Sequence, residues 1–148
     1  EDSVNVVNST GTLESVRVKD GYSDAVDIDF SEIEFSTIEV ETAGNDCLDV
    51  SGGIYLLGDA QFVGCADKAI SVGERSNLVF RRARISTSKI GVAIKDFSTV
   101  EGRDWLVNDT EICVDVSQKK QEFGGAYASV PSENCSGTFQ VDKHSILQ

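Results

Sequence analysis

The sequence predicts an all-β protein in which short strands stack in parallel as the coils of a β-solenoid. An apolar pair separated by one residue returns every 22 residues in a single register. The six pairs are Val4/Val6, Val26/Ile28, Leu48/Val50, Ile70/Val72, Val92/Ile94 and Val114/Val116. Apolar residues two apart lie on one side of a strand, and a fixed period of about 20–50 residues is typical of repeat architectures. We therefore expect five to six coils of about 22 residues around one continuous core.

Further apolar rows follow nearly the same interval and predict three short strands in each coil. One row is Val16/Val18, Ile38/Val40, Ala60/Phe62 and, after a one-residue insertion, Ala83/Ile85 and Trp105/Val107. Another is Ile33/Phe35, Ile54/Leu56, Leu78/Phe80 and Val100. Turns rich in Gly, Ser and charge separate the rows, which is the punctuation expected between strands. An antiparallel sandwich gives no reason for such a constant phase, and no segment shows helical periodicity.

The whole chain, residues 1–148, is expected to form a single domain. Regular coils cover 4–117, and residues 118–148 form a loop and an irregular C-terminal cap. Within that cap we expect a loop over 118–125 and strands within 126–130 and 137–141. A register unbroken through the loop places Ser136 and Thr138 beside Val114 and Val116. Since Val4 is already in register, no N-terminal cap is visible; we expect a longer chain, or end-to-end association through this first coil.

The formal net charge is −12, and the charges are unevenly distributed. Residues 1–67 contain 15 acids and two bases, whereas residues 68–104 contain eight bases and four acids. Nucleic-acid binding requires a basic face, so this charge balance argues against it. No apolar run approaches the roughly 20 residues that a membrane-spanning helix needs, so membrane insertion is not expected.

Three segments of the repeat resemble the right-handed parallel β-helix repeat family, the pectate-lyase-like superfamily. They are GNDCLDVSGG (44–53), ADKAISVGERS (66–76) and KIGVAIKDFS (89–98), and QKKQEFGG (118–125) is also similar. The resemblance implies a right-handed parallel β-helix and a place in a secreted or surface-attached bacterial protein. Many members act on acidic polysaccharides, whereas others are binding or structural modules, so function has to be argued from the site.

Four aspartates form a candidate calcium site. Asp24 and Asp46, and likewise Asp27 and Asp49, occupy equivalent positions in two successive coils, about 5 Å apart along the stack. Stacked carboxylates repel one another unless a cation or protonation relieves them, and calcium binds several such oxygens. In the alternative interpretation these side chains cap turns by accepting hydrogen bonds from backbone N–H groups. No other cofactor is expected.

Three basic residues are candidates for polysaccharide lyase or epimerase chemistry, which needs a base and a group that neutralises the uronate carboxylate. Lys95 lies on an outward row near Ser71 and Asp115 of the adjacent row, and Arg82 and Arg84 flank Ala83 on the outward side of another strand. The alternative is a solvated face on which these bases pair with nearby acids.

The cysteines at positions 113 and 135 are 22 residues apart, which is one coil if the register continues. Their Cα atoms would then lie about 5 Å apart, within the range that a disulfide tolerates. Free, buried cysteines at a tight corner are the alternative. Cys47 and Cys113 are three coils apart, about 14 Å, which excludes a bond between them.

From the sequence we expect a non-catalytic β-helical module used for structure or for binding a carbohydrate or another protein. The alternative is a small lyase or epimerase that acts on acidic polysaccharide, assisted by calcium. The expected location is secreted or at the bacterial cell surface.

Overall fold

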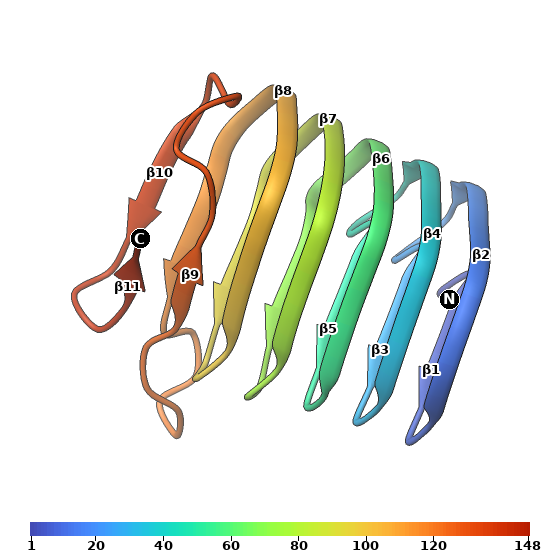
Figure 1. Cartoon of the computed structure of the whole chain (residues 1–148), viewed down its shortest axis with the longest axis horizontal. Helices are drawn as coiled ribbons and strands as arrows, with labels where there is room; N and C mark the ends of the chain where they lie inside the picture. The colour runs from blue at the N-terminus through green and yellow to red at the C-terminus, as the bar shows by residue number, and fades with distance from the viewer.

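The computed structural model describes residues 1–148 as a parallel β-solenoid without helices (Figure 1). Its strands are β1 (Val4–Val7), β2 (Thr10–Gly21), β3 (Val26–Asp29), β4 (Glu32–Ala43), β5 (Leu48–Ser51), β6 (Ile54–Gly73), β7 (Asn77–Lys95), β8 (Thr99–Ser117), β9 (Tyr127–Ser129), β10 (Thr138–Val141) and β11 (Ile146–Leu147). The predicted fold is confirmed. The stack contains about seven coils rather than five to six, because the C-terminal segment continues it.

Each coil has three faces that stack separately along the solenoid. The first face contains β1, β3, β5 and the last residues of β6, β7 and β8, paired in parallel. The second and third faces are formed by successive parts of the long strands β2, β4, β6, β7 and β8, before the last three of these strands turn into the first face. We call the turn between the first and second faces the first corner; it includes residues 8–9, 30–31, 52–53, 74–76 and 96–98.

One inward row of the first face forms the predicted core ladder. Its members pair with one another from coil to coil and have no exposed surface: Val26, Leu48, Ile70, Val92 and Val114. β-branched and Leu side chains suit this position because a parallel strand in the stack presents one face entirely to the interior. Burial of each such side chain stabilises the fold by roughly 1.5–3 kcal/mol. The ladder belongs to a core of 35 buried residues that runs through the solenoid.

The second face differs from the prediction at one coil. Ile54 and Leu56 point outward and are 58% and 42% exposed, whereas Tyr55 and Leu57 are buried. All four residues of the run Ile-Tyr-Leu-Leu are apolar, so hydropathy alone does not show which alternate residues point inward. The 22-residue interval from Ile33 does select Tyr55, and the two residues pair. The Tyr55 hydroxyl is satisfied inside the core because it donates to the backbone carbonyl of Ser51, 2.8 Å away.

The predicted one-residue insertion lies at the first corner. Ser51 pairs with Gly73, an offset of 22, but Ile54 pairs with Asn77, an offset of 23. A compensating irregularity between Cys65 and Lys68 returns the register to 22 before the next first-face strand. The inward row of the third face is buried as expected at Val40, Phe62, Ile85 and Val107.

The C-terminal residues form an additional coil that covers the end of β8. The segment 118–125 contains no strand, as predicted, and β9 then pairs with residues 99–101 of β8. β10 pairs with the end of β8, and β11 pairs with β9. The extrapolated register is wrong: Phe139 and Val141 lie beside Val114 and Val116, because the irregular connection shifts the alignment by three residues.

Candidate functional site

The first face carries an acidic row in its N-terminal half. Asp27 and Asp49 pair in register on adjacent coils, and the Asn5 amide donates to Asp27 Oδ2 at 3.1 Å. Burial raises the pKa of Asp27 to about 6, and the neighbouring carboxylates of Asp29 and Asp49 add to the effect. Burial also raises the pKa of Asp49, although Lys95 opposes this shift. The row therefore concentrates negative charge that the fold only partly compensates.

Asp24 and Asp46 act as caps at the turn that precedes the first face. Asp24 Oδ1 accepts the backbone N–H of Asp46 at 2.9 Å and the Asn45 amide at 2.8 Å. One coil later, Asp46 Oδ1 accepts the backbone N–H of Lys68 at 3.0 Å, and the Lys68 ammonium lies 3.4 Å from the same oxygen. Each carboxylate therefore satisfies a backbone donor of the next coil.

The four candidate calcium ligands do not converge on one position. The caps lie at the turn, whereas Asp27 and Asp49 lie on the face itself, and no group of three or more His, Cys, Asp or Glu side chains is arranged to hold a metal ion. Because Asp24 and Asp46 already accept backbone N–H groups, the geometry supports the capping interpretation of these two residues.

Lys95 lies in the middle of the first face. Its Nζ donates a hydrogen bond to Ser71 Oγ at 2.9 Å, and Ser71 has no exposed surface. Burial lowers the pKa of Lys95, against the opposing charge of Asp49. On the far side of Lys95, burial and the nearby Asp142 raise the pKa of Asp115. Lys95 thus contacts Ser71 directly, whereas Asp115 lies on the neighbouring row, paired with Ala93, and senses Lys95 only through its charge.

The two candidate arginines lie on a different face from Lys95. Arg82 and Arg84 project from the third face and form ion pairs with acids of the neighbouring coils. The Arg82 guanidinium lies 2.9 Å from Asp59 and 3.5 Å from Asp104, and that of Arg84 lies 3.0 Å from Asp104. The same face pairs Arg17 with Glu39 further along the stack. The structure thus does not bring the three candidate catalytic residues together.

The first corner contains a groove that the sequence interpretation missed. It has a volume of about 420 Å³, and the lining includes Asn8, Ser9, Phe30, Glu32, Ile54 and Arg75. Phe30 and Ile54 are large apolar residues that are 59% and 58% exposed. The signal in the sequence is an apolar residue inside a turn, which the pattern of inward strand positions does not include.

An aromatic clamp holds Arg75 at the edge of this groove. The Arg75 guanidinium lies 5.6 Å from the ring centroid of Phe97 and 5.5 Å from that of Phe123. The two rings contact each other edge to face, at 6.1 Å. Phe123 belongs to the segment 118–125, so this contact fixes that segment against the first corner.

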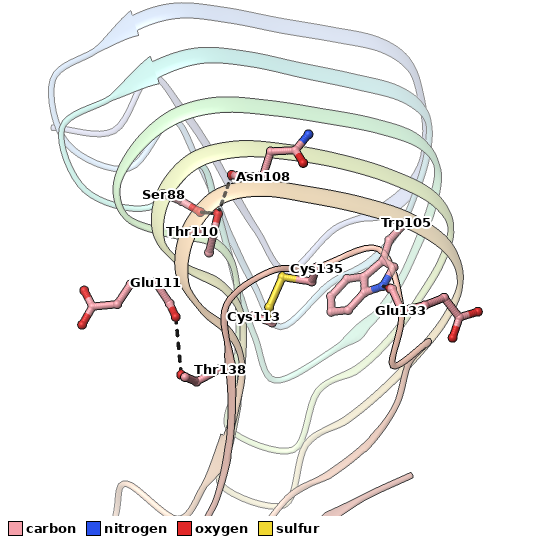
Figure 2. Close-up of a disulfide and its surroundings, with 9 residues drawn as sticks. All are labelled: Ser88, Trp105, Asn108, Thr110, Glu111, Cys113, Glu133, Cys135 and Thr138. Atoms are coloured by element: carbon pink, nitrogen blue, oxygen red, sulfur yellow. Dashed lines mark hydrogen bonds between the residues drawn. A yellow bond between two sulfur atoms is a disulfide. The ribbon is translucent and has the colours of Figure 1, made fainter.

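Two disulfides staple the solenoid. Cys113 and Cys135 form a bond with a Cα–Cα distance of 6.2 Å, and Figure 2 shows it beside the indole of Trp105. Cys135 is paired with Val107 rather than stacked on Cys113, so the bond joins two faces of neighbouring coils. The second bond, Cys47–Cys65, was not predicted, because its separation of 18 residues does not follow the 22-residue repeat. It joins the start of the first face to the end of the third, 5.4 Å apart at Cα.

The structure contains no helix with the length and apolar character needed to span a membrane. No family profile, curated protein or solved structure gives a significant match to this chain. The parallel β-solenoid is thus established by the coil-to-coil pairing of the strands themselves.

Proposed function

We propose that this chain is a non-catalytic β-helical module of a secreted or surface-exposed bacterial protein, and that it binds carbohydrate. The observation that carries the proposal is the groove at the first corner, where the exposed Phe30 ring adjoins polar side chains. Sugars present a flat C–H face and many hydroxyl groups, so a sugar site combines an aromatic ring with donors and acceptors. Ligand sites generally pair an apolar surface with a few convergent polar groups in this way.

The third face supports a structural rather than a catalytic role for its bases. Arg82 and Arg84 are both occupied by Asp59 and Asp104, so their charges stabilise the alignment of coils. Exposed pairs of this kind contribute little individually, but they oppose register slippage between stacked strands. The likeness of 44–53, 66–76 and 89–98 to the pectate-lyase-like superfamily agrees with this proposal, since that group includes binding modules.

The two disulfides support the proposed location. Structural disulfides form and persist in oxidising compartments, outside the reducing cytosol. All four cysteines of the chain are paired. A polar surface with net charge −12 and a stapled stack are suited to an extracellular environment.

The second candidate function is a lyase or epimerase, and Lys95 is the observation that favours it. An amine whose pKa is lowered by burial is more often neutral near pH 7, as a general base requires. In β-elimination such a base removes the proton beside the uronate carboxylate, the C–O bond to the leaving sugar breaks, and that oxygen is protonated. The product contains a new carbon–carbon double bond.

One experiment separates the two candidates. The protein is incubated with neutral and acidic oligosaccharides, binding is measured by calorimetry, and unsaturated product is followed by ultraviolet absorbance. Binding without product, unchanged in Lys95→Ala, supports the module. Product formation that Lys95→Ala abolishes and Arg82→Ala leaves intact supports the lyase instead.

End-to-end association is a further part of the proposal. β1 and β2 pair on one side only, with β3 and β4, so their other edges are open to another strand. Sedimentation velocity over a range of protein concentrations tests it, and a single species at all concentrations would contradict it.

A further inference from the structure

The first corner places an equivalent residue in the left-handed conformation in every regular coil, and in the last two coils the next residue, Arg75 or Phe97, is left-handed as well. Its equivalent residues are 22 positions apart and all have positive φ angles: Asn8 (52°), Phe30 (48°), Gly52 (63°), Glu74 (54°) and Asp96 (57°). This left-handed conformation closes the turn between the first and second faces. Glycine adopts it readily, and asparagine and aspartate are several-fold enriched there among other residues. The corner therefore constrains which residue types fit well.

Phe30 is the residue in this column that the fold does not explain. A bulky residue with positive φ is a genuine outlier, and such strained positions cluster at functional sites. Its ring does not contribute to the core, since 59% of the residue is exposed. The other members have evident reasons: Gly52 lacks a side chain, Glu74 pairs with Lys120, and Asp96 Oδ1 accepts the backbone N–H of Lys119 at 2.7 Å.

The Phe30 ring is held in a defined position. It lies against the backbone of Gly52 in the next coil, where an added Cβ would be 2.4 Å from Phe30 Cδ1 and 2.7 Å from Cε1. A side chain at position 52 would thus displace the ring. Because contact with Gly52 already restricts the ring, the Phe30 side chain loses little conformational freedom when a ligand packs on it.

From these contacts we infer that Phe30 is the stacking platform for a neutral pyranose unit of a saccharide chain, bound in the first-corner groove. This inference rests on the proposed carbohydrate-binding function and specifies its site and ligand class. The axial C–H groups of a pyranose carry partial positive charge and pack on the negative face of an aromatic ring. Asn8, Glu32 and Arg75 line the same groove and supply donors and acceptors for the sugar hydroxyls.

The charges around the groove favour a neutral sugar over a uronate. Arg75 is its one lining base, and the rings of Phe97 and Phe123 already face that guanidinium. Glu32 forms no ion pair and lines the same groove. The unpaired Glu32 carboxylate disfavours an anionic ligand, and the N-terminal part of the chain to which most of the lining belongs, residues 1–67, has 15 acids and two bases.

The test uses Phe30→Asn, because asparagine already occupies the same column at Asn8. The matched control is Tyr22→Asn, which removes another exposed aromatic ring, 89% exposed and outside the groove. Binding of neutral gluco- and xylo-oligosaccharides and of oligogalacturonates of equal length is measured by calorimetry, and thermal melts are recorded for each variant.

We expect Phe30→Asn to weaken binding of the neutral oligosaccharide about tenfold. Its melting temperature should rise, because strain at the corner is relieved, while Tyr22→Asn should bind as the wild type does. A preference for oligogalacturonate would overturn the neutral assignment. Unchanged binding in Phe30→Asn would place the ligand elsewhere while leaving the proposed function intact. A lowered melting temperature would make Phe30 a packing residue, and failure of every saccharide to bind would remove both the inference and the proposed function.

Discussion

The indole Nε1 of Trp105 donates a hydrogen bond to the backbone carbonyl of Glu133, 2.9 Å away, and so ties the penultimate coil to the C-terminal one (Figure 2). Trp105 is 1% exposed and is also contacted by Phe139 of β10, at a ring distance of 6.4 Å. The C-terminal coil therefore covers the only tryptophan of the chain. The Cys113–Cys135 bond lies beside this contact and holds the same coil in place.

Removal of this disulfide should loosen the C-terminal coil. In the chain-entropy description, a bond that spans 22 residues contributes about 3 kcal/mol to the free energy of unfolding. We expect Cys113→Ser/Cys135→Ser to lower the denaturant midpoint and to increase acrylamide quenching of Trp105 in native buffer. The matched control is Cys47→Ser/Cys65→Ser, which opens a loop of similar length, 18 residues, two coils away from Trp105. Equal quenching in the two double variants would contradict the capping role of the C-terminal coil.

Truncation of a core-ladder residue should cost far more than truncation of an outward one. Leu48→Ala removes a fully buried side chain from the first-face ladder, so we expect a loss of about 2–5 kcal/mol in the free energy of unfolding. Gln61→Ala changes an exposed side chain of the third face and should remain within about 0.5 kcal/mol of the wild type. Urea denaturation of both variants measures the difference, and similar losses would mean that the inward and outward positions are misassigned.

Asp27 should make the protein less stable as pH rises from 4 to 6. Its pKa is about 6 in the folded chain against an ordinary value of 3.8, so the unfolded chain releases this proton first and unfolding becomes more favourable over that range. We expect Asp27→Asn to be more stable than the wild type at pH 7.5, by roughly 1 kcal/mol after allowance for solvent screening, and to lose the advantage near pH 4. Denaturant melts across this range test it. Asp20→Asn, at an exposed corner, is the control, and an advantage that persists at pH 4 would contradict the titration argument.

Calcium should leave the melting temperature unchanged. Two of the four predicted ligands, Asp24 and Asp46, already accept backbone N–H groups, and no group of three or more His, Cys, Asp or Glu side chains is arranged to hold a metal ion. We expect identical melts in millimolar calcium and in chelator. Asp46→Ala removes the acceptor of the Lys68 backbone N–H and should lower the free energy of unfolding by about 1 kcal/mol in both. A calcium-dependent rise that Asp46→Ala abolishes would restore the metal-site hypothesis through binding linkage.

The sequence by itself determined the stacking direction, the repeat length and most inward positions. A parallel stack requires equivalent residues to meet in successive coils, so burial imposes one period on the whole chain, as in the ladder from Val26 to Val114. The proximity of Lys95 to Ser71 was predictable for the same reason. Where successive residues are all apolar, as at Ile54 and Tyr55, hydropathy alone does not show which of them points inward.

Only the tertiary structure decided the relations between faces. Whether Arg82 and Lys95 meet depends on how each coil bends at its corners, and a strand pattern carries no information about that. The Cys47–Cys65 bond joins two faces within one coil, and Cys113–Cys135 forms although the register shifts after residue 118. The exposed Phe30 was equally hidden, because its meaning lies in the backbone conformation that it shares with Gly52 and in the ring contact between them. Such contacts depend on three-dimensional closure of the coil, whereas the repeat depends only on spacing along the chain.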